Sequence, residues 1–243
     1  MRGPQAGFHV ERTVRRVARG GRTGGQPQHD VSGIADAGAA AQKKSLHASE
    51  RDTPRVKALR EEFRQSVAKV NPRKLVFVDE SGANTALTPS RGRAISGERV
   101  VGAVPHGHWK VLTMLGALRL EGPVAEATVE APTDSEVFRT FVRESLAPAL
   151  RPGDVVVWDN LSPHRAAGVV EAVLARHAAV LPLPPYSPDF SPIEPGWSKV
   201  KQAMRRAEAR TSERLGEAAG MAFASITSTD TRGWFKKCGY PVH

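Results

Sequence analysis

KLVFVDES, residues Lys74–Ser81, is the stretch from which the fold of this chain can be predicted. Four apolar residues, Leu75 to Val78, are followed at once by an aspartate. A short, continuous run of β-branched and aromatic residues is typical of a strand that is buried on both faces of a sheet. The stretch therefore predicts a buried strand with Asp79 at its C-terminal end.

Two later stretches repeat this pattern. DVVVWDN (Asp154–Asn160) predicts a second buried strand, again with an aspartate, Asp159, at its end, and AAVLPLP (178–184) predicts a third. The apolar residues between them recur at helical spacing, which predicts a helix over residues 164–177. Strands joined through helices are typical of a parallel sheet.

The region between the first two buried strands has a different pattern. WKVLTMLGALRL (109–120) and PVAEATVEA (123–131) lie on either side of Glu121-Gly122, which predicts a β-hairpin. A stretch ahead of the hairpin, ERVVGAV (98–104), predicts a further short strand.

Three more segments predict helices. The first lies within residues 45–70, the second runs from the capping sequence TDSE (133–136) to Pro152-Gly153, and the third follows Ile193. The order of all these elements predicts an α/β fold. Its sheet is expected to be mixed, with antiparallel hairpin strands followed by parallel strands, and to be flanked by helices.

The length of 243 residues fits one domain of ordinary size with an appendage. Residues 1–42 are rich in Gly, Arg, Ala and Gln without an apolar period, which predicts a disordered or atypical N-terminal segment. We assign residues 43–72 to a helical linker and residues 73–243 to the main domain.

Composition excludes several classes of protein. The sequence has no apolar run of the length that crosses a membrane, and its N-terminus lacks the apolar core of a secretory signal. One cysteine, Cys238, excludes an internal disulfide framework and fits a reducing cytoplasm. Aromatic residues make up only 6% of the chain, which argues against a glycosidase with a sugar-stacking platform.

The net charge of +10 is unevenly distributed. Residues 1–74 hold 16 Lys and Arg against 7 Asp and Glu, residues 75–195 hold 10 against 14, and residues 196–243 hold 9 against 4. An acidic middle is therefore flanked by basic ends. Such ends suit a polyanion such as DNA, although a solvated basic surface gives the same pattern.

Three carboxylates stand out by their positions. Asp79 and Asp159 each end a predicted strand, and Glu194 lies at a helix start after the third strand. Sites in open α/β sheets form outside the carboxyl ends of the strands, so the three side chains can converge there. Carboxylates that converge repel one another unless a cation neutralises them, and hard oxygen ligands favour Mg²⁺ or Mn²⁺.

Each of these residues also has a simpler interpretation. An aspartate at a strand end often only begins a turn. Ser191-Pro192-Ile193-Glu194 matches a capping box, and Pro195 is expected to push Glu194 out of regular helical geometry. His164 fits a polar helix start, and Trp197 fits a core position on an amphipathic helix.

Four stretches resemble the catalytic domain of bacterial insertion-sequence transposases of the Tc/mariner superfamily. They are FVDESGANT (77–85), GERVVGAVPHGHWKVLTMLGAL (97–118), RPGDVVVWDNLSPH (151–164) and LPPYSPDFSPIEPGWSKVK (183–201). The resemblance extends from about Lys43 to Tyr240. The 34 residues between Asp159 and Glu194 are the spacing that it leads one to expect.

The resemblance implies a ribonuclease H-like fold over residues 73–243, with Asp79, Asp159 and Glu194 as the catalytic acids. It implies two Mg²⁺ or Mn²⁺ ions held by these acids, with Asp79 bridging both. The implied activity is DNA cleavage and strand transfer of an insertion sequence, by cut-and-paste movement into a TA-containing target. The groups expected around the acids or on DNA are Asn160, His164, Lys199 and Lys201.

The resemblance also implies partners. They are the terminal inverted repeats of the element, target DNA and a second copy of the chain in a homodimer, at the nucleoid in the bacterial cytoplasm. Members of the family can be split into two reading frames joined by frameshifting, and the chain resembles the second part, with a helix-turn-helix half upstream. Two alternatives are a catalytically inactive DNA-binding remnant and a nuclease on the same fold.

Overall fold

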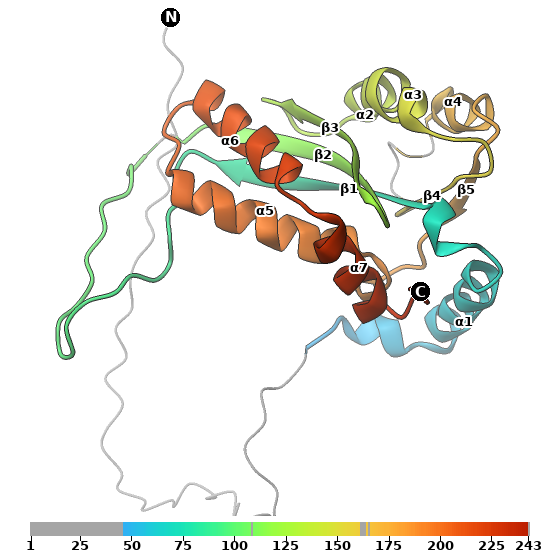
Figure 1. The fold of residues 1–243 in the computed structure, drawn as a ribbon, viewed down its shortest axis with the longest axis horizontal. Coiled ribbons are helices and arrows are strands. Elements are labelled where there is room, and N and C mark those ends of the chain that lie inside the picture. Colours follow the sequence, from blue (N-terminus) through green and yellow to red (C-terminus); the bar gives the residue numbers. More distant parts are fainter. Residues whose placement is uncertain (1–45, 108, 161–163, 165, 243) are drawn as a thin grey trace, which may run out of the picture. The chain divides into compact units, whose positions relative to one another are not determined.

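The computed structural model describes residues 46–107, 109–160, 164 and 166–242, so the predicted segment 1–42 lies outside the described residues. A five-stranded sheet in the order β3-β2-β1-β4-β5 forms the centre (Figure 1). Its strands are β1 (Leu75–Asn84), β2 (Val111–Arg119), β3 (Gly122–Val129), β4 (Val155–Trp158) and β5 (Ala179–Pro182). The hairpin β2–β3 and its neighbour β1 pair antiparallel, whereas β1, β4 and β5 pair parallel. The predicted mixed sheet is confirmed.

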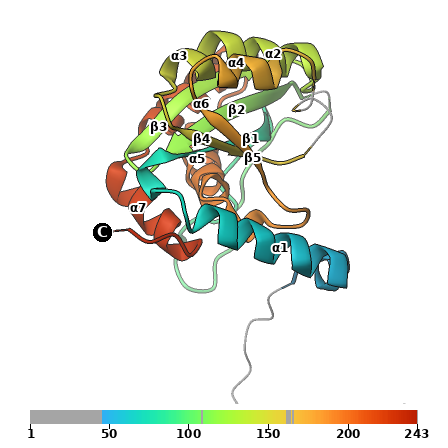
Figure 2. The ribbon, with the colours of Figure 1, turned by 90° about the vertical axis from the view of Figure 1, so that its right-hand side faces the viewer.

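Helices cover both faces of this sheet (Figures 1 and 2). One face carries α2 (Ser135–Phe141), α3 (Ala147–Ala149) and α4 (Val169–Leu174), with a π-helical turn, Val142–Leu146, between α2 and α3. The other face carries α5 (Ile193–Ala207), α6 (Ser212–Ala224) and α7 (Ser228–Lys237). Helix α1 (Pro54–Val67) lies beside the loop that precedes α5.

Strand β1 divides its side chains between the two layers because successive residues of a strand point to opposite faces. Leu75 and Phe77 pack into the core beneath α5, α6 and α7, while Val76 and Val78 pack into the core beneath α2 and α4. All four side chains are 0 to 1% exposed. Asp79 comes two residues after Phe77 and therefore points to the same face of the sheet, the one that α5 covers.

The strand around Asp79 is longer than the sequence predicts. Pairing of β1 with β4 ends at Phe77 opposite Val157, but pairing with β2 continues as far as Asn84. Asp79 thus lies inside β1, at the level where the strand has lost its parallel neighbour. This position opens one side of the aspartate to the loops that follow β4 and β5.

Two local predictions are wrong. Residues 98–104 form no strand and belong instead to a long connection between β1 and β2, in which Val100 and Val101 are exposed rather than buried against a sheet. The helix predicted over residues 164–177 is shorter, because Gly168 has a left-handed backbone (φ 85°) and α4 begins only after it. Within the described residues, no helix is long and apolar enough to cross a membrane.

Candidate active site

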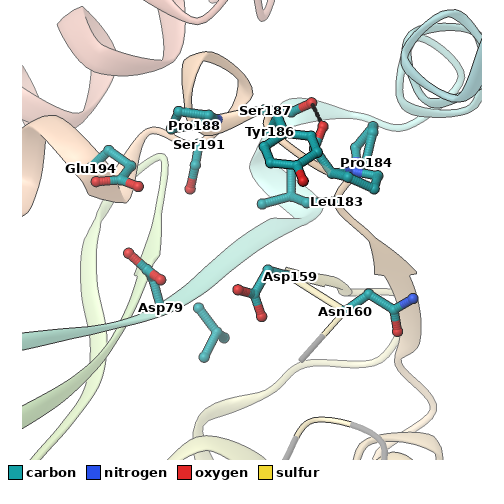
Figure 3. A pocket seen from close by; sticks show the side chains of 12 residues that line it. Asp79, Asp159, Asn160, Leu183, Pro184, Tyr186, Ser187, Pro188, Ser191 and Glu194 are labelled. Atoms are coloured by element: carbon teal, nitrogen blue, oxygen red, sulfur yellow. Dashed lines mark hydrogen bonds between the residues drawn. The ribbon is translucent and has the colours of Figure 1, made fainter. Parts of the chain in front are cut away.

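A pocket of about 410 Å³ opens where the parallel strands end (Figure 3). The acids Asp79, Asp159 and Glu194 line it, coming from β1, the segment after β4 and the start of α5. The remaining lining residues are Val78, Asn160, Leu183, Pro184, Pro185, Tyr186, Ser187, Pro188 and Ser191. The three acids that the sequence analysis singled out are therefore brought to one pocket, although 115 positions separate the first from the last.

Asp79 is held from the α5 side. The indole Nε1–H of Trp197 donates a hydrogen bond of 3.0 Å to its Oδ2 atom. Burial, and then the negative charges of Glu194 and Asp159, raise the pKa of Asp79 to about 7, although hydrogen bonds from the Glu80 backbone and Trp197 act in the opposite direction. The acids of the pocket therefore lie near enough to repel one another.

Glu194 is the second residue of α5, and Pro195 is the third. The first four N–H groups of a helix have no partner within it, so a proline in this turn removes no helical hydrogen bond. The expectation that Pro195 displaces Glu194 from helical geometry is wrong for that reason. The capping box is wrong too, because the N-cap is Pro192 and no side chain caps the helix.

Asp159 is linked to a buried histidine. Nδ1 of His164 lies 2.6 Å from Oδ1 of Asp159, and Nε2 lies 2.9 Å from Oε1 of Glu80. Burial alone would lower the pKa of His164, but its hydrogen bonds to Asp159 and Glu80 outweigh burial and raise the pKa to about 9. The ring is 2% exposed and packs on Phe138, so His164 links Glu80 to Asp159 from a buried position and does not line the pocket.

The two lysines predicted near the acids have different surroundings. The ammonium of Lys199 lies 2.5 Å from Oδ2 of Asp230 and 3.2 Å from the carbonyl oxygen of Ser225, so it is used in fixing α5 to the start of α7. Lys201 acts electrostatically on Glu194, whose pKa burial raises and Lys201 lowers. Of these two lysines, Lys201 is therefore the one that interacts electrostatically with an acid of the pocket.

The donor set of the pocket fits a hard divalent cation, because its ligand atoms are carboxylate oxygens and their mutual repulsion would be relieved by positive charge. Among the described residues, no three Asp, Glu, His or Cys side chains already lie close enough together to hold one ion. Asp79, Asp159 and Glu194 would therefore have to approach one another for joint coordination.

The loop between β5 and α5 is anchored by residues that sequence reasoning missed. Arg60 of α1 makes two hydrogen bonds to the carboxylate of Asp189, of 3.0 and 2.7 Å, and one of 2.6 Å to Oγ of Ser187. Its guanidinium also lies 4.1 Å from the ring centroid of Phe190. Arginines on helices are usually solvated, so helical spacing alone gave no signal for this contact.

The role of Trp197 was also missed in part. The sequence predicts a core residue, and Trp197 is indeed 4% exposed and lies within the core beneath α5. Its hydrogen bond to Asp79 was not predicted. A signal for it existed, because Trp197 follows Glu194 by three residues and therefore shares its helix face, and because a buried indole needs an acceptor.

Solved structures with the same architecture define the class of fold. The Mos1 transposase paired-end complex with left transposon end matches with a TM-score of 0.66 and 18% identity, over 87% of this chain and 67% of that chain. The Mos1 mariner paired-end complex with Mn matches with a TM-score of 0.62 and 20% identity, over 87% of this chain and 68% of that chain. The catalytic domain of Mos1 mariner transposase matches with a TM-score of 0.58 and 16% identity, over 81% of this chain and 93% of that chain. The fold of this chain is ribonuclease H-like, as the sequence analysis predicted.

The family follows from the sequence itself. Residues 74–216 match the family model of the DDE superfamily endonuclease. This match covers more than half of the chain and includes Asp79, Asp159 and Glu194. The chain belongs to the DDE superfamily of endonucleases. No curated protein matches it.

Proposed function

We propose that the chain is a Tc/mariner-type DDE transposase that cleaves DNA at the ends of an insertion sequence and joins them to target DNA. The convergence of Asp79, Asp159 and Glu194 on one pocket of a ribonuclease H-like sheet carries this proposal. The Mos1 structures on the same fold are complexes with transposon ends and include forms with Mn and Mg, which supports DNA and divalent metal as partners here.

The residues of the chain have distinct parts in this proposal. Asp79, Asp159 and Glu194 hold Mg²⁺ or Mn²⁺, His164 orients Asp159, and Asn160, which lines the same pocket, contacts DNA. Two ions bound there would lower the pKa of an attacking water and offset charge on the phosphodiester. The test is Mn²⁺-dependent nicking of DNA by the purified chain and its dependence on Asp79.

Catalytic activity is favoured over an inactive remnant by the start of α5. A proline next to Glu194 would argue for an inactive remnant if it displaced this acid, but Pro195 fits the first turn of the helix without loss of a hydrogen bond. The carboxylate of Glu194 lines the pocket instead of capping its own helix. A nuclease on the same fold would share the first chemical step and would differ in lacking strand transfer.

Lys201→Gln is expected to weaken DNA binding, because Lys201 is the lysine whose charge reaches the pocket. The slope of log affinity against log salt should fall by about 1, as for one lost phosphate contact. Fluorescence anisotropy with duplex DNA at several salt concentrations measures both quantities. Lys199→Gln is the matched control and should leave the slope unchanged, since its ammonium is held by Asp230. Equal slopes for the wild type, Lys201→Gln and Lys199→Gln would contradict the assignment of Lys201 as a phosphate contact.

The homodimer is supported by the arm, residues 88–107 between β1 and β2, which extends away from the sheet (Figure 1). Ile95 is 75% and Val101 84% exposed, and exposed apolar residues gathered in one segment mark an interaction surface. We expect Ile95→Asp with Val101→Asp to turn a dimer on DNA into a monomer in sedimentation experiments. Leu174→Asp, at an apolar residue of α4 that is 54% exposed, should not.

Recognition of the terminal repeats is assigned in this proposal to a helix-turn-helix half encoded upstream and joined by frameshifting. The basic charge of residues 196–243 supports contact of the described part with the DNA backbone, which gives affinity without sequence specificity. An overlapping upstream frame between inverted repeats in the flanking DNA would support this arrangement.

A further inference from the structure

Trp197 occupies a position that core packing alone does not require. Its indole is 4% exposed, and its N–H group points to a carboxylate rather than to solvent or to a backbone carbonyl. A buried indole N–H needs an acceptor, and here the acceptor is Oδ2 of Asp79 at 3.0 Å. The side chain therefore joins the core beneath α5 to the first acid of the pocket.

The geometry of α5 makes this contact possible. Trp197 follows Glu194 by three residues, which places both on one face of the helix. Glu194 points into the pocket from the end of the helix, and Trp197 approaches Asp79 one turn further along. A single rigid helix therefore carries one acid and positions another.

Gly116 provides the space for the indole. It lies directly opposite Asp79 in the antiparallel pairing of β1 and β2. A Cβ atom at this position would lie 2.7 Å from Cη2 of Trp197 and 2.8 Å from Cε2 of Phe223, closer than real Cβ atoms approach. The tryptophan ring also packs on the ring of Phe223, with 5.6 Å between centroids. The indole is thus confined from both sides and has little freedom to turn away from Asp79.

We propose that Trp197 is a positioning residue for the metal site: its indole N–H fixes the orientation of the Asp79 carboxylate, and Gly116 leaves the room that this requires. The inference rests on the proposed function, in which Asp79 is a metal ligand. Hydrogen bonds that orient a ligand are known to change metal affinity about 10- to 100-fold when they are removed. A residue that only fills the core would have no such effect.

Trp197→Phe separates the two roles, because phenylalanine keeps an apolar ring and lacks the donor. We expect Mn²⁺ alone to bind this variant about 10-fold more weakly than the wild-type chain, as followed by electron paramagnetic resonance. Trp234→Phe is the matched control, since Trp234 packs against the same core and lies beside Gly196 of α5. This control should bind Mn²⁺ as the wild type does. Gly116→Ala should weaken Mn²⁺ binding as Trp197→Phe does, because the added methyl group displaces the indole.

A second measurement tests the hydrogen bond without metal. The chain has four tryptophans, so a ¹H–¹⁵N spectrum contains four indole N–H signals. The signal that is missing from the spectrum of Trp197→Phe is that of Trp197. Asp79→Ala should shift this signal and speed its exchange with solvent. An unmoved signal would overturn the inference whatever the metal does.

The failure of the inference is distinguishable from failure of the proposed function. Equal Mn²⁺ affinity of the wild type and Trp197→Phe would show that Trp197 is a core residue only, with the metal site intact. A wild-type chain that binds no Mn²⁺ would remove the metal site itself and the inference with it.

Discussion

Asp79→Asn is expected to abolish metal-dependent DNA cleavage while leaving the fold at least as stable as that of the wild-type chain. Asparagine is isosteric, and its amide oxygen can still accept the hydrogen bond from Trp197. It lacks the negative charge that a divalent ion would need in the pocket. Nicking of supercoiled DNA in Mn²⁺ measures the first effect, and denaturant unfolding of the metal-free protein measures the second.

The stability of this variant should depend on pH in a defined direction. Burial and the charges of Glu194 and Asp159 raise the pKa of Asp79 to about 7, so the ionised carboxylate is less favourable in the folded chain than in the unfolded one. This penalty is absent below the unfolded pKa of about 3.9, increases as the pH rises, and is fully present above 7. The advantage of Asp79→Asn in free energy of unfolding should therefore appear between about pH 4 and pH 7.

Asp134→Asn is the control for the same chemical change. Asp134 caps α2 and does not line the pocket, and asparagine is an equally good N-cap residue. This variant should cleave DNA as the wild type does and show no gain in stability at neutral pH. Undiminished cleavage by Asp79→Asn would remove Asp79 from the proposed metal site.

The elements that sequence predicted well are those with a strong local signal. The apolar runs at Leu75 to Val78 and at Val155 to Trp158 became the parallel neighbours β1 and β4, because a short run of β-branched and aromatic residues without alternation is typical of a strand covered on both faces. The hairpin predicted at Glu121-Gly122 is present: Leu120 and Glu121 form the turn, and Gly122, with a positive φ of 140°, is the first residue of β3. The meeting of the three acids in one pocket followed from these elements.

The wrong predictions concern features that depend on tertiary contacts rather than on the local sequence. ERVVGAV has the residue types of a strand, but it joins no strand of the sheet, and residues 98–104 remain exposed. The extent of β1 beyond Asp79 depends on its pairing with β2, which no local pattern encodes. Pro195 was misjudged because the first residue of α5 is uncertain by one or two positions from sequence, and that margin decides whether a proline is tolerated.

The contacts around the site were the least predictable. His164 joins Glu80 to Asp159 across 84 and 5 positions of sequence, and Trp197 joins α5 to β1 across 118. Such pairs depend on which faces meet after folding. Only the need of a buried polar group for a partner could have suggested them, and that need does not identify the partner.

Arg60→Met is expected to lower the free energy of unfolding by about 2 to 3 kcal/mol, below the 3 to 5 kcal/mol typical when one member of a fully buried pair is removed. Methionine keeps part of the apolar stem, while the hydrogen bonds to Asp189 and Ser187 are lost. The side chain of Arg60 is 5% exposed but that of Asp189 is 40% exposed, so water can solvate the remaining carboxylate and reduce the cost. Urea unfolding at pH 7 measures the change.

The pH dependence of this loss identifies its cause. Burial alone would raise the pKa of Asp189, but the hydrogen bonds and charge of Arg60, with the charge of Arg51, outweigh burial and hold the pKa below its usual value. The stabilisation is therefore present above the unfolded pKa of about 3.9 and is lost as the pH falls through the lower, folded value. The difference between wild type and Arg60→Met should shrink below about pH 4. A difference that stays constant down to pH 3 would mean that packing on Phe190, rather than the ion pair, accounts for the effect of Arg60.

Because the anchored loop lines the pocket through Ser187 and Pro188, Arg60→Met should also reduce DNA cleavage at a temperature where the fold is intact.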